Sequence, residues 1–233
     1  MKIHIIRHGD PDYSIDSLTE KGWREAELLS RRIARLPIDD FYCSPLGRAK
    51  DTLKPTLEKV KKDFEVLPWL REFEGRKEAS TPGKTRIAWD IPPSLWCNEM
   101  NYYTLDRWTD TSWMKDSTAP KAYPEVQEGI DRLLLRYGWR RDGMAYYGGE
   151  DKEIALFCHF GLGSLVMGYL LGIPPVVAQN SFFLAPTSVT TLVTETDTTG
   201  CSHFRATGVG DISHLYAGDE PMSESGLYPN FEK

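Results

Sequence analysis

The chain has 233 residues and a formal net charge of −6, and 40% of its residues are hydrophobic. This composition supports a packed core and excludes a disordered chain, and the length suits one α/β domain, with or without an insertion. The acidic balance argues against a nucleic-acid binder, and no apolar run approaches the ~20 residues that a membrane helix needs. We therefore expect neither nucleic acid nor membrane as a partner.

The chain opens directly on a strand. Residues 2–6 form a short apolar run that predicts a buried strand and leaves no room for a secretory leader, which indicates a cytoplasmic location. The four cysteines are scattered without a CxxC pair, which argues against a metal or redox site. Cys43 and Cys158 end apolar runs, and we expect both thiols to be buried.

Two helices and two more strands follow in the first third. Thr19 can cap a helix whose apolar residues recur at helical spacing. Residues 40–43 predict a second strand, and Ser44-Pro45 after it suits the start of another helix. Residues 65–67 predict a third short strand. Strands and helices therefore alternate from the start of the chain.

Residues from about 73 to 122 differ in character, because aromatic residues crowd them without a clear period. The aromatic residues of this stretch include Trp89, Trp96, Tyr102, Tyr103, Trp108 and Trp113. We interpret the stretch as an insertion over the core, within a single domain that spans residues 1–233. Its aromatic rings suit a lid over a bound ligand, and plain hydrophobic packing is the alternative.

The second half resumes the alternation. A helical stripe runs from Pro124 to Tyr137, and residues 154–158 predict the clearest strand of the chain, followed by a helix over about 162–171. Residues 188–194 and 204–207 predict the last strands. This order predicts an α/β fold, a three-layer α/β/α sandwich around a mostly parallel central sheet.

Chemically capable side chains follow three of the predicted strands. Arg7 and His8 come after the first strand, Arg48 lies at the start of the helix after the second, and His159 follows the strand at 154–158. Ligands of such sheets bind beyond the carboxyl ends of the strands, so these residues can meet in one crevice. Glu72, after the strand at 65–67, can reach the same edge.

Together these residues supply what phosphoryl transfer requires. A neutral His8 can act as nucleophile, and Arg7 and Arg48 offer planar guanidinium groups suited to phosphate oxygens. His159 can donate to the same oxygens, and Glu72 with a raised pKa can protonate the leaving group. A cation in the first turn of a helix, such as Arg48, opposes the helix dipole unless an anion is present, although an ion pair with Asp51 would also explain it.

Several motifs, in order along the chain, resemble those of the histidine phosphatase superfamily, which has the phosphoglycerate mutase-like fold. They are Arg7-His8-Gly9, Leu18-Thr19-Glu20-Lys21-Gly22, the block from Ser44 to Thr52, Leu70-Arg71-Glu72 and the later His159. The resemblance implies His8 as phospho-acceptor, Arg7, Arg48 and His159 as the phosphate pocket, and Glu72 as proton donor. We expect a small phosphorylated substrate and leave a homo-oligomer open, and we expect no cofactor or metal because cationic side chains supply the charge.

The chain departs from the family pattern at two places. The family commonly has His-Gly at the second histidine, whereas this chain has His159-Phe160-Gly161, which puts the local backbone shape in question. Glu74 follows Glu72 by two residues and competes for the role of the acid. We expect Glu72 to be the acid and Glu74 to be a surface carboxylate.

A phosphoglycerate mutase of the same family is the first alternative. Those enzymes resemble this chain in length but carry an Arg-Arg pair in the insertion, which is missing here. The loop from Asp10 to Asp16 is acidic and would repel the second phosphate of a bisphosphate. The sequence therefore favours hydrolysis. The aromatic density and few cations of the insertion favour a medium-sized organic phosphate as substrate.

Two further alternatives are weaker. Gly161-Leu162-Gly163 follows a strand and opens a helix, as in a dinucleotide-binding site, but Val166 stands where the third glycine is needed. A binding module without catalysis would have lost at least one of the candidate catalytic residues, and all of them are present.

Overall fold

The computed structural model describes residues 1–78 and 85–227 of the chain. Within these residues one large mixed sheet forms the centre of the molecule. Its strands, in order across the sheet, are β5 (Phe64–Val66), β4 (Asp40–Cys43), β10 (Glu153–Cys158), β1 (Lys2–Arg7), β11 (Val189–Thr196), β12 (Cys201–Asp211), β9 (Ala145–Gly148) and β8 (Trp139–Asp142). The first four of these run parallel, and each later strand is antiparallel to its neighbour.

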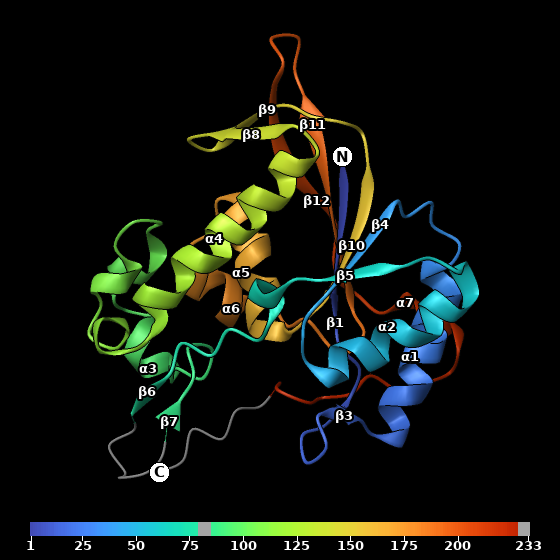
Figure 1. Cartoon of the computed structure of the whole chain (residues 1–233). Helices are drawn as coiled ribbons and strands as arrows, with labels where there is room; N and C mark the ends of the chain where they lie inside the picture. The colour runs from blue at the N-terminus through green and yellow to red at the C-terminus, as the bar shows by residue number, and fades with distance from the viewer. Residues whose placement is uncertain (79–84, 228–233) are drawn as a thin grey trace.

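Helices cover both faces of this sheet (Figure 1). On one face lie α1 (Glu20–Ile33), α2 (Gly47–Val60) and the short α7 (Ser213–Ala217), and on the other lie α4 (Ala119–Arg136), α5 (Phe160–Leu171) and α6 (Pro175–Ser181). The expected three-layer α/β/α arrangement with parallel strands at its centre is confirmed. The antiparallel half of the sheet carries the last strands of the chain and a hairpin.

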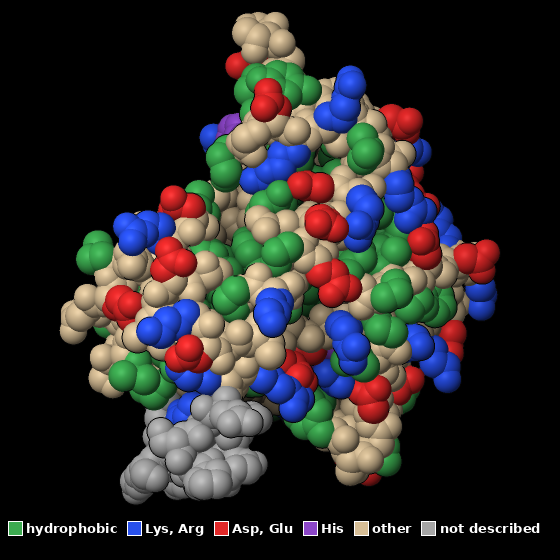
Figure 2. Space-filling model, turned by 60° about the vertical axis from the view of Figure 1, so that its left-hand side comes forward, with side chains coloured by type: hydrophobic (Ala, Val, Ile, Leu, Met, Phe, Trp, Pro, Cys, Tyr) green, Lys and Arg blue, Asp and Glu red, His purple; other side chains and the backbone are tan. Residues whose placement is uncertain are grey.

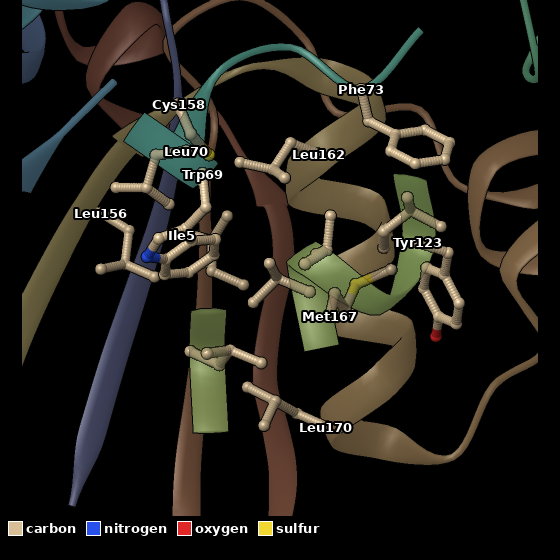
Figure 3. Packing of buried hydrophobic residues seen from close by; sticks show 14 of the residues in the cluster. Ile5, Trp69, Leu70, Phe73, Tyr123, Leu156, Cys158, Leu162, Met167 and Leu170 are labelled. Atoms are coloured by element: carbon tan, nitrogen blue, oxygen red, sulfur yellow. The ribbon is translucent and has the colours of Figure 1, made fainter. Parts of the chain in front are cut away.

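The side chains of β1 alternate between the two layers of helices. Ile3 and Ile5 belong to the main hydrophobic cluster with α4 and α5, whereas Ile6 belongs to a smaller cluster with Leu29 of α1 and Leu53 of α2. A strand that is covered on both faces is largely apolar, which explains the isoleucines at residues 2–6, and the buried His4 among them is hydrogen-bonded to Glu153. Figure 3 shows the packing of the main cluster.

Helix boundaries follow local chemistry, and the starts of α2, α4 and α5 differ by two to five residues from expectation. The Thr19 side chain accepts a hydrogen bond from the Gly22 amide at 3.0 Å and so caps α1 as predicted. Helix α4 begins at Ala119, five residues before the expected start, and Pro124 lies inside it. Pro120 in its first turn costs no hydrogen bond, because the first amides of a helix have no partner within it.

The elements that were not expected from the sequence include the β8–β9 hairpin and helix α6. The β8–β9 hairpin pairs through a ladder from Trp139–Gly148 to Asp142–Ala145, and it extends the sheet at its edge. Helix α6 has seven residues and follows α5 closely. Both are too short to show a clear period in the sequence.

The segment at about 73–122 is built of short pieces. They are β6 (Lys77–Glu78), β7 (Thr85–Arg86), α3 (Pro93–Trp96) and the 3₁₀ turns η2 (Met100–Tyr103), η3 (Trp108–Asp110) and η4 (Met114–Asp116), while residues 79–84 lie outside the described part. Tyr102, Trp108 and Trp113 are 0%, 3% and 7% exposed and pack into the main hydrophobic cluster. Most aromatic side chains of the insertion are therefore core residues.

Charged side chains of both signs are mixed on the surface. Figure 2 shows acidic and basic side chains interspersed on the face it presents. Among the described residues, no helix is both long enough and apolar enough to cross a membrane.

Candidate active site

The carboxyl ends of β1, β10 and β4 lie side by side and bring three motifs together. Arg7 is in register with Cys158, and Phe157 is in register with Cys43. Backbone hydrogen bonds continue just past the ends of β1 and β4 and fix the chain there. The His8 amide donates to the Cys158 carbonyl at 3.0 Å, and the Ser44 amide donates to the Phe157 carbonyl at 2.9 Å. The sheet therefore places His8 and His159 in contact, with ring centroids 5.1 Å apart.

His8 has the geometry of a nucleophile. Its Nδ1 lies 2.7 Å from the carbonyl oxygen of Gly9, which can only accept, so Nδ1 carries the proton and Nε2 keeps its lone pair. Burial, followed by the charge of Arg7, lowers the pKa of His8 well below its ordinary value. The imidazole is therefore neutral near pH 7, as a nitrogen nucleophile must be.

Ser44 orients the second histidine. The Ser44 Oγ lies 2.7 Å from Nε2 of His159, and the Leu46 amide donates to the same Oγ at 3.2 Å. Burial, followed by the neighbouring His8, lowers the pKa of His159 well below its ordinary value, so this ring is neutral too. When the Ser44 hydroxyl donates to Nε2, the His159 proton lies on Nδ1, which is buried without a partner.

Two backbone carbonyls and two aromatic rings contact the Arg7 guanidinium. Its two terminal nitrogens donate to the carbonyls of Leu184 at 2.7 Å and Ser225 at 2.8 Å. The guanidinium lies over the rings of Phe160 and Phe183, at 5.4 and 5.8 Å from their centroids. Its Nε is buried without a hydrogen-bond partner. The sequence suggested a free planar guanidinium, whereas in the structure both terminal nitrogens already donate to carbonyls and only Nε has no hydrogen-bond partner.

Arg48 lies at the start of α2 and pairs with Asp16, not with Asp51. Its terminal nitrogen contacts one Asp16 oxygen at 2.6 Å, and the Gly47 amide donates to the other at 2.7 Å. A side chain on Gly47 would meet the Asp16 carbonyl, because a Cβ built there lies 2.1 Å from it. Asp16 thus occupies the anion position at this helix N-terminus, and Arg48 Nε remains buried without a partner.

Three buried donors therefore lack partners around His8, namely Arg7 Nε, Arg48 Nε and His159 Nδ1. An unsatisfied buried donor costs roughly 1–3 kcal/mol, and native proteins rarely keep several together without a use for them. All three belong to the residues for which the sequence predicts phosphate contact. An oxyanion with several acceptor oxygens would satisfy them.

Glu72 is positioned by backbone amides. Its Oε1 accepts hydrogen bonds from the Phe73 amide at 2.8 Å and the Leu162 amide at 3.0 Å. The flanking Leu70, Phe73 and Leu162 turn into the main hydrophobic cluster (Figure 3). Burial raises the pKa of Glu72 to about 7 against the opposing effect of these amides. Near neutral pH the carboxyl group can therefore both give and take a proton.

A cavity of about 750 Å³ opens on the Arg48 and Glu72 side of this site, and the buried Arg7, His8 and His159 are not among the residues that line it. Arg48, Glu72 and Glu74 line it, and Trp89 contributes from the insertion. Glu74 pairs with Arg76, and this ion pair lowers the pKa of Glu74. The competing acid is thus held ionised. Within residues 1–78 and 85–227, no three His, Cys, Asp or Glu side chains gather as a metal site would require.

Sequence reasoning missed three supporting residues. Ser44 orients His159, Asp16 pairs with Arg48, and the Thr52 hydroxyl accepts from the Gly9 amide at 2.9 Å while donating to the Arg48 carbonyl at 2.7 Å. Ser44 and Thr52 lie in the motif block that carries Arg48, so their position in that block was the available signal. Nothing in the sequence singled out Asp16 from the other acids of its loop.

Comparisons with known proteins agree with this geometry. The family described as the histidine phosphatase superfamily (branch 1) matches residues 3–207. A probable phosphatase of Schizosaccharomyces pombe is 39% identical over 67 residues, which are 25% of this chain and 32% of that protein. A 2,3-bisphosphoglycerate-dependent phosphoglycerate mutase of Thermoplasma acidophilum is 38% identical over 74 residues, 27% of this chain and 37% of that protein. These matches span about a third of the length of either relative.

Longer matches have lower identity. The adenosylcobalamin/alpha-ribazole phosphatase of Salmonella typhi is 22% identical over 184 residues, 75% of this chain and 81% of that protein. The crystal structure of a phosphoserine phosphatase from Entamoeba histolytica has a TM-score of 0.61 at 18% identity and covers 92% of this chain and 98% of its own. At that identity the likeness shows a shared fold, and it confirms the fold expected from the motifs.

Proposed function

The chain belongs to the histidine phosphatase superfamily, and we propose that it hydrolyses phosphomonoesters of small organic metabolites through a phosphohistidine on His8. One observation carries this proposal. Three buried donors without partners, from Arg7, Arg48 and His159, surround a histidine whose pKa is lowered and whose Nε2 keeps its lone pair. This arrangement suits a phosphoryl group in line with a nitrogen nucleophile.

In the first step Nε2 of His8 attacks phosphorus, and the bond from phosphorus to the ester oxygen breaks. The protonated Glu72 gives its proton to that oxygen, so the substrate leaves as an alcohol. The unused donors of Arg7, Arg48 and His159 hold the other phosphate oxygens as charge shifts among them. His8 then carries the phosphoryl group on Nε2, and the proton on its Nδ1 stays there and is donated in a hydrogen bond to the Gly9 carbonyl.

In the second step water attacks the phosphohistidine. The Glu72 carboxylate takes a proton from this water, and the bond between phosphorus and Nε2 breaks. Inorganic phosphate leaves, and His8 and Glu72 return to their starting protonation states. A pKa near 7 suits Glu72 for both directions of proton transfer.

Hydrolysis is favoured over mutase chemistry by the loop that carries Asp16. A mutase must bind two phosphates, but the Asp16 carboxylate lines the cavity next to Arg48 and is 2.6 Å from it. A second phosphate entering there would meet a carboxylate that already uses this cation and the Gly47 amide. The electrostatics of the outer cavity therefore support water as the final acceptor.

The cavity supports a substrate of medium size. Its volume of about 750 Å³ lies within the range for small-molecule sites, and Trp69 and Trp89 supply aromatic surface beside the charged groups. The cations of this cavity are more numerous than the sequence of the insertion suggested, because Arg71 and Arg76 also line it. We propose an organic phosphate with a planar or apolar group.

The test combines turnover with identification of the phosphorylated residue. The purified protein should release phosphate from p-nitrophenyl phosphate, and rapid quenching in base should trap an acid-labile phosphoryl group on the peptide that contains His8. His8→Ala should abolish both signals. His203→Ala is the matched control, because His203 is an exposed histidine on β12. Absence of phosphate release, or labelling of a residue other than His8, would contradict the proposal.

A further inference from the structure

Phe160 stands where the related motif commonly has glycine, directly after His159. Its side chain is 7% exposed, and its ring faces the buried Arg7, whose guanidinium carbon lies 5.4 Å from the ring centroid. Phe183 faces the same guanidinium at 5.8 Å, and the two rings are 6.0 Å apart. The departure from the motif thus places an aromatic ring on the cation next to the nucleophile.

We propose that Phe160 is a positioning residue, which with Phe183 fixes the plane of the Arg7 guanidinium so that Nε is presented to the substrate phosphate. The proposal rests on the proposed function, because it assumes that Arg7 binds phosphate. It also assigns a role to a residue that the family motif does not contain.

The hydrogen bonds of Arg7 show why a further constraint is needed. Both terminal nitrogens donate to backbone carbonyls, those of Leu184 and Ser225. Two such contacts fix the edge of the guanidinium but allow it to tilt about the line that joins them. Rings that pack on the guanidinium restrict this tilt, and a cation facing a ring that is shielded from water gains electrostatic stabilisation as well. Nε remains as the donor without a partner.

The insertion supports Phe160 from behind. The Trp89 ring meets the Phe160 ring edge to face, with centroids 5.9 Å apart and an interplanar angle of 77°. Gly161 makes this contact possible, because a Cβ at that position would lie 2.2 Å from the Trp89 ring. The Phe160-Gly161 pair therefore couples a tryptophan of the insertion to an arginine at the end of β1.

The experiment measures the affinity for orthovanadate, a phosphate analogue, by calorimetry on the full chain. Phe160→Leu keeps apolar volume but removes the ring, and it should raise the vanadate Kd roughly 3- to 30-fold, the range for a cation–π contact from exposed to desolvated. Phe160→Tyr keeps the ring and should restore the Kd to within about twofold of the unaltered protein. In an Arg7→Met background, Phe160→Leu should have no further effect, because the ring then has no cation to position.

Control variants separate positioning from simple packing. Phe182 is the residue next to Phe183, and the Phe182 ring packs against the main hydrophobic cluster. Phe182→Leu should therefore leave the Kd unchanged. If Phe160→Leu does not fold, Phe183→Leu tests the second ring on Arg7 in the same way. An unchanged Kd in the leucine variant, or an equal loss with and without Arg7, would overturn the role of Phe160 and leave the phosphatase intact. Failure of the unaltered protein to bind vanadate would instead contradict the proposed function, and this inference with it.

Discussion

Two regions of the molecule, the strand ends and the insertion, are built in opposite ways. The strand-end cluster, defined as Arg7, His8, Ser44 and His159, consists of buried polar groups fixed by hydrogen bonds to the backbone or to one another. The insertion at 73–122 consists of short turns whose aromatic side chains enter the hydrophobic core. The first region contains buried hydrogen-bond donors without partners. The second is held by hydrophobic packing, and its Trp89 lines the cavity.

This difference separates chemistry from selectivity. A donor that is buried and unused gains most when an anion arrives, so the strand-end cluster is suited to the reacting phosphate. An aromatic wall contributes contact area and shape, so the insertion is suited to the rest of the substrate. Changes in the first region should lower activity on every substrate, while changes in the second should alter the order of preference among substrates.

The largest effect within this comparison is expected at Glu72. Glu72→Gln keeps the shape of the side chain but cannot donate a proton to the leaving oxygen, and it should lower kcat/KM by about 10²–10⁴-fold on substrates with poor leaving groups. An aryl phosphate with an acidic leaving group should lose much less. Glu74→Gln is the matched control in the same cavity and should change kcat/KM less than about threefold, because Glu74 pairs with Arg76. A larger loss at Glu74 than at Glu72 would exchange their roles.

The dependence of kcat/KM on pH should also show that Glu72 acts as the acid. Burial raises the pKa of Glu72 to about 7, and the carboxyl group must be protonated to act as acid, so kcat/KM should fall as the pH rises through about 7. His8 must be neutral, and its pKa is lowered well below the ordinary value, so activity should fall only in distinctly acidic solution. Steady-state rates across pH on a substrate with a poor leaving group test both limbs. Persistence of the upper limb in Glu72→Gln would assign it to another group.

A smaller loss is expected from Ser44, which in the proposed mechanism acts on the substrate only through His159. Ser44→Ala removes the hydroxyl 2.7 Å from Nε2 and allows the ring to place its proton there instead of on Nδ1. Loss of one oriented donor to the phosphate should lower kcat about tenfold or more, with a smaller change in stability. Nitrogen NMR of the His159 ring would report the tautomer. Unchanged kcat together with an unchanged tautomer would show that Ser44 only caps its turn.

The two regions also differ in how far the sequence predicts them. Arg48, Glu72 and His159 could be predicted because each lies at a fixed short distance after a strand, and strand ends gather at one edge of a parallel sheet. The pairing of Asp16 with Arg48 could not be predicted, because Asp10, Asp12 and Asp16 are alike in sequence and only the folded loop selects one.

For the insertion, the sequence predicted an aromatic-rich composition but not which residues form turns or which side chains are buried. Its turns are too short for a period, so the sequence could not distinguish Tyr102, which is fully buried, from Trp89, which reaches the cavity. The missed β8–β9 hairpin and α6 have the same cause, since short elements are specified by what they pack against. Deletion of residues 80–118 would therefore remove core side chains and unfold the protein, so a single substitution is the better test of the insertion.

Trp89→Ala is expected to give the smallest and most selective effect. Trp89 both lines the cavity and supports Phe160, and these roles predict different results. Loss of support for Phe160 would weaken all substrates equally, because every substrate carries the same phosphate. Loss of an aromatic wall would weaken aryl phosphates about two- to tenfold more than small alkyl phosphates. Trp96→Ala, in the same insertion but not among the residues that line this cavity, should leave the ratio unchanged. An unchanged ratio of kcat/KM for aryl phosphates to kcat/KM for small alkyl phosphates in Trp89→Ala would show that the insertion has only a structural role. It would contradict the assignment of selectivity to the insertion.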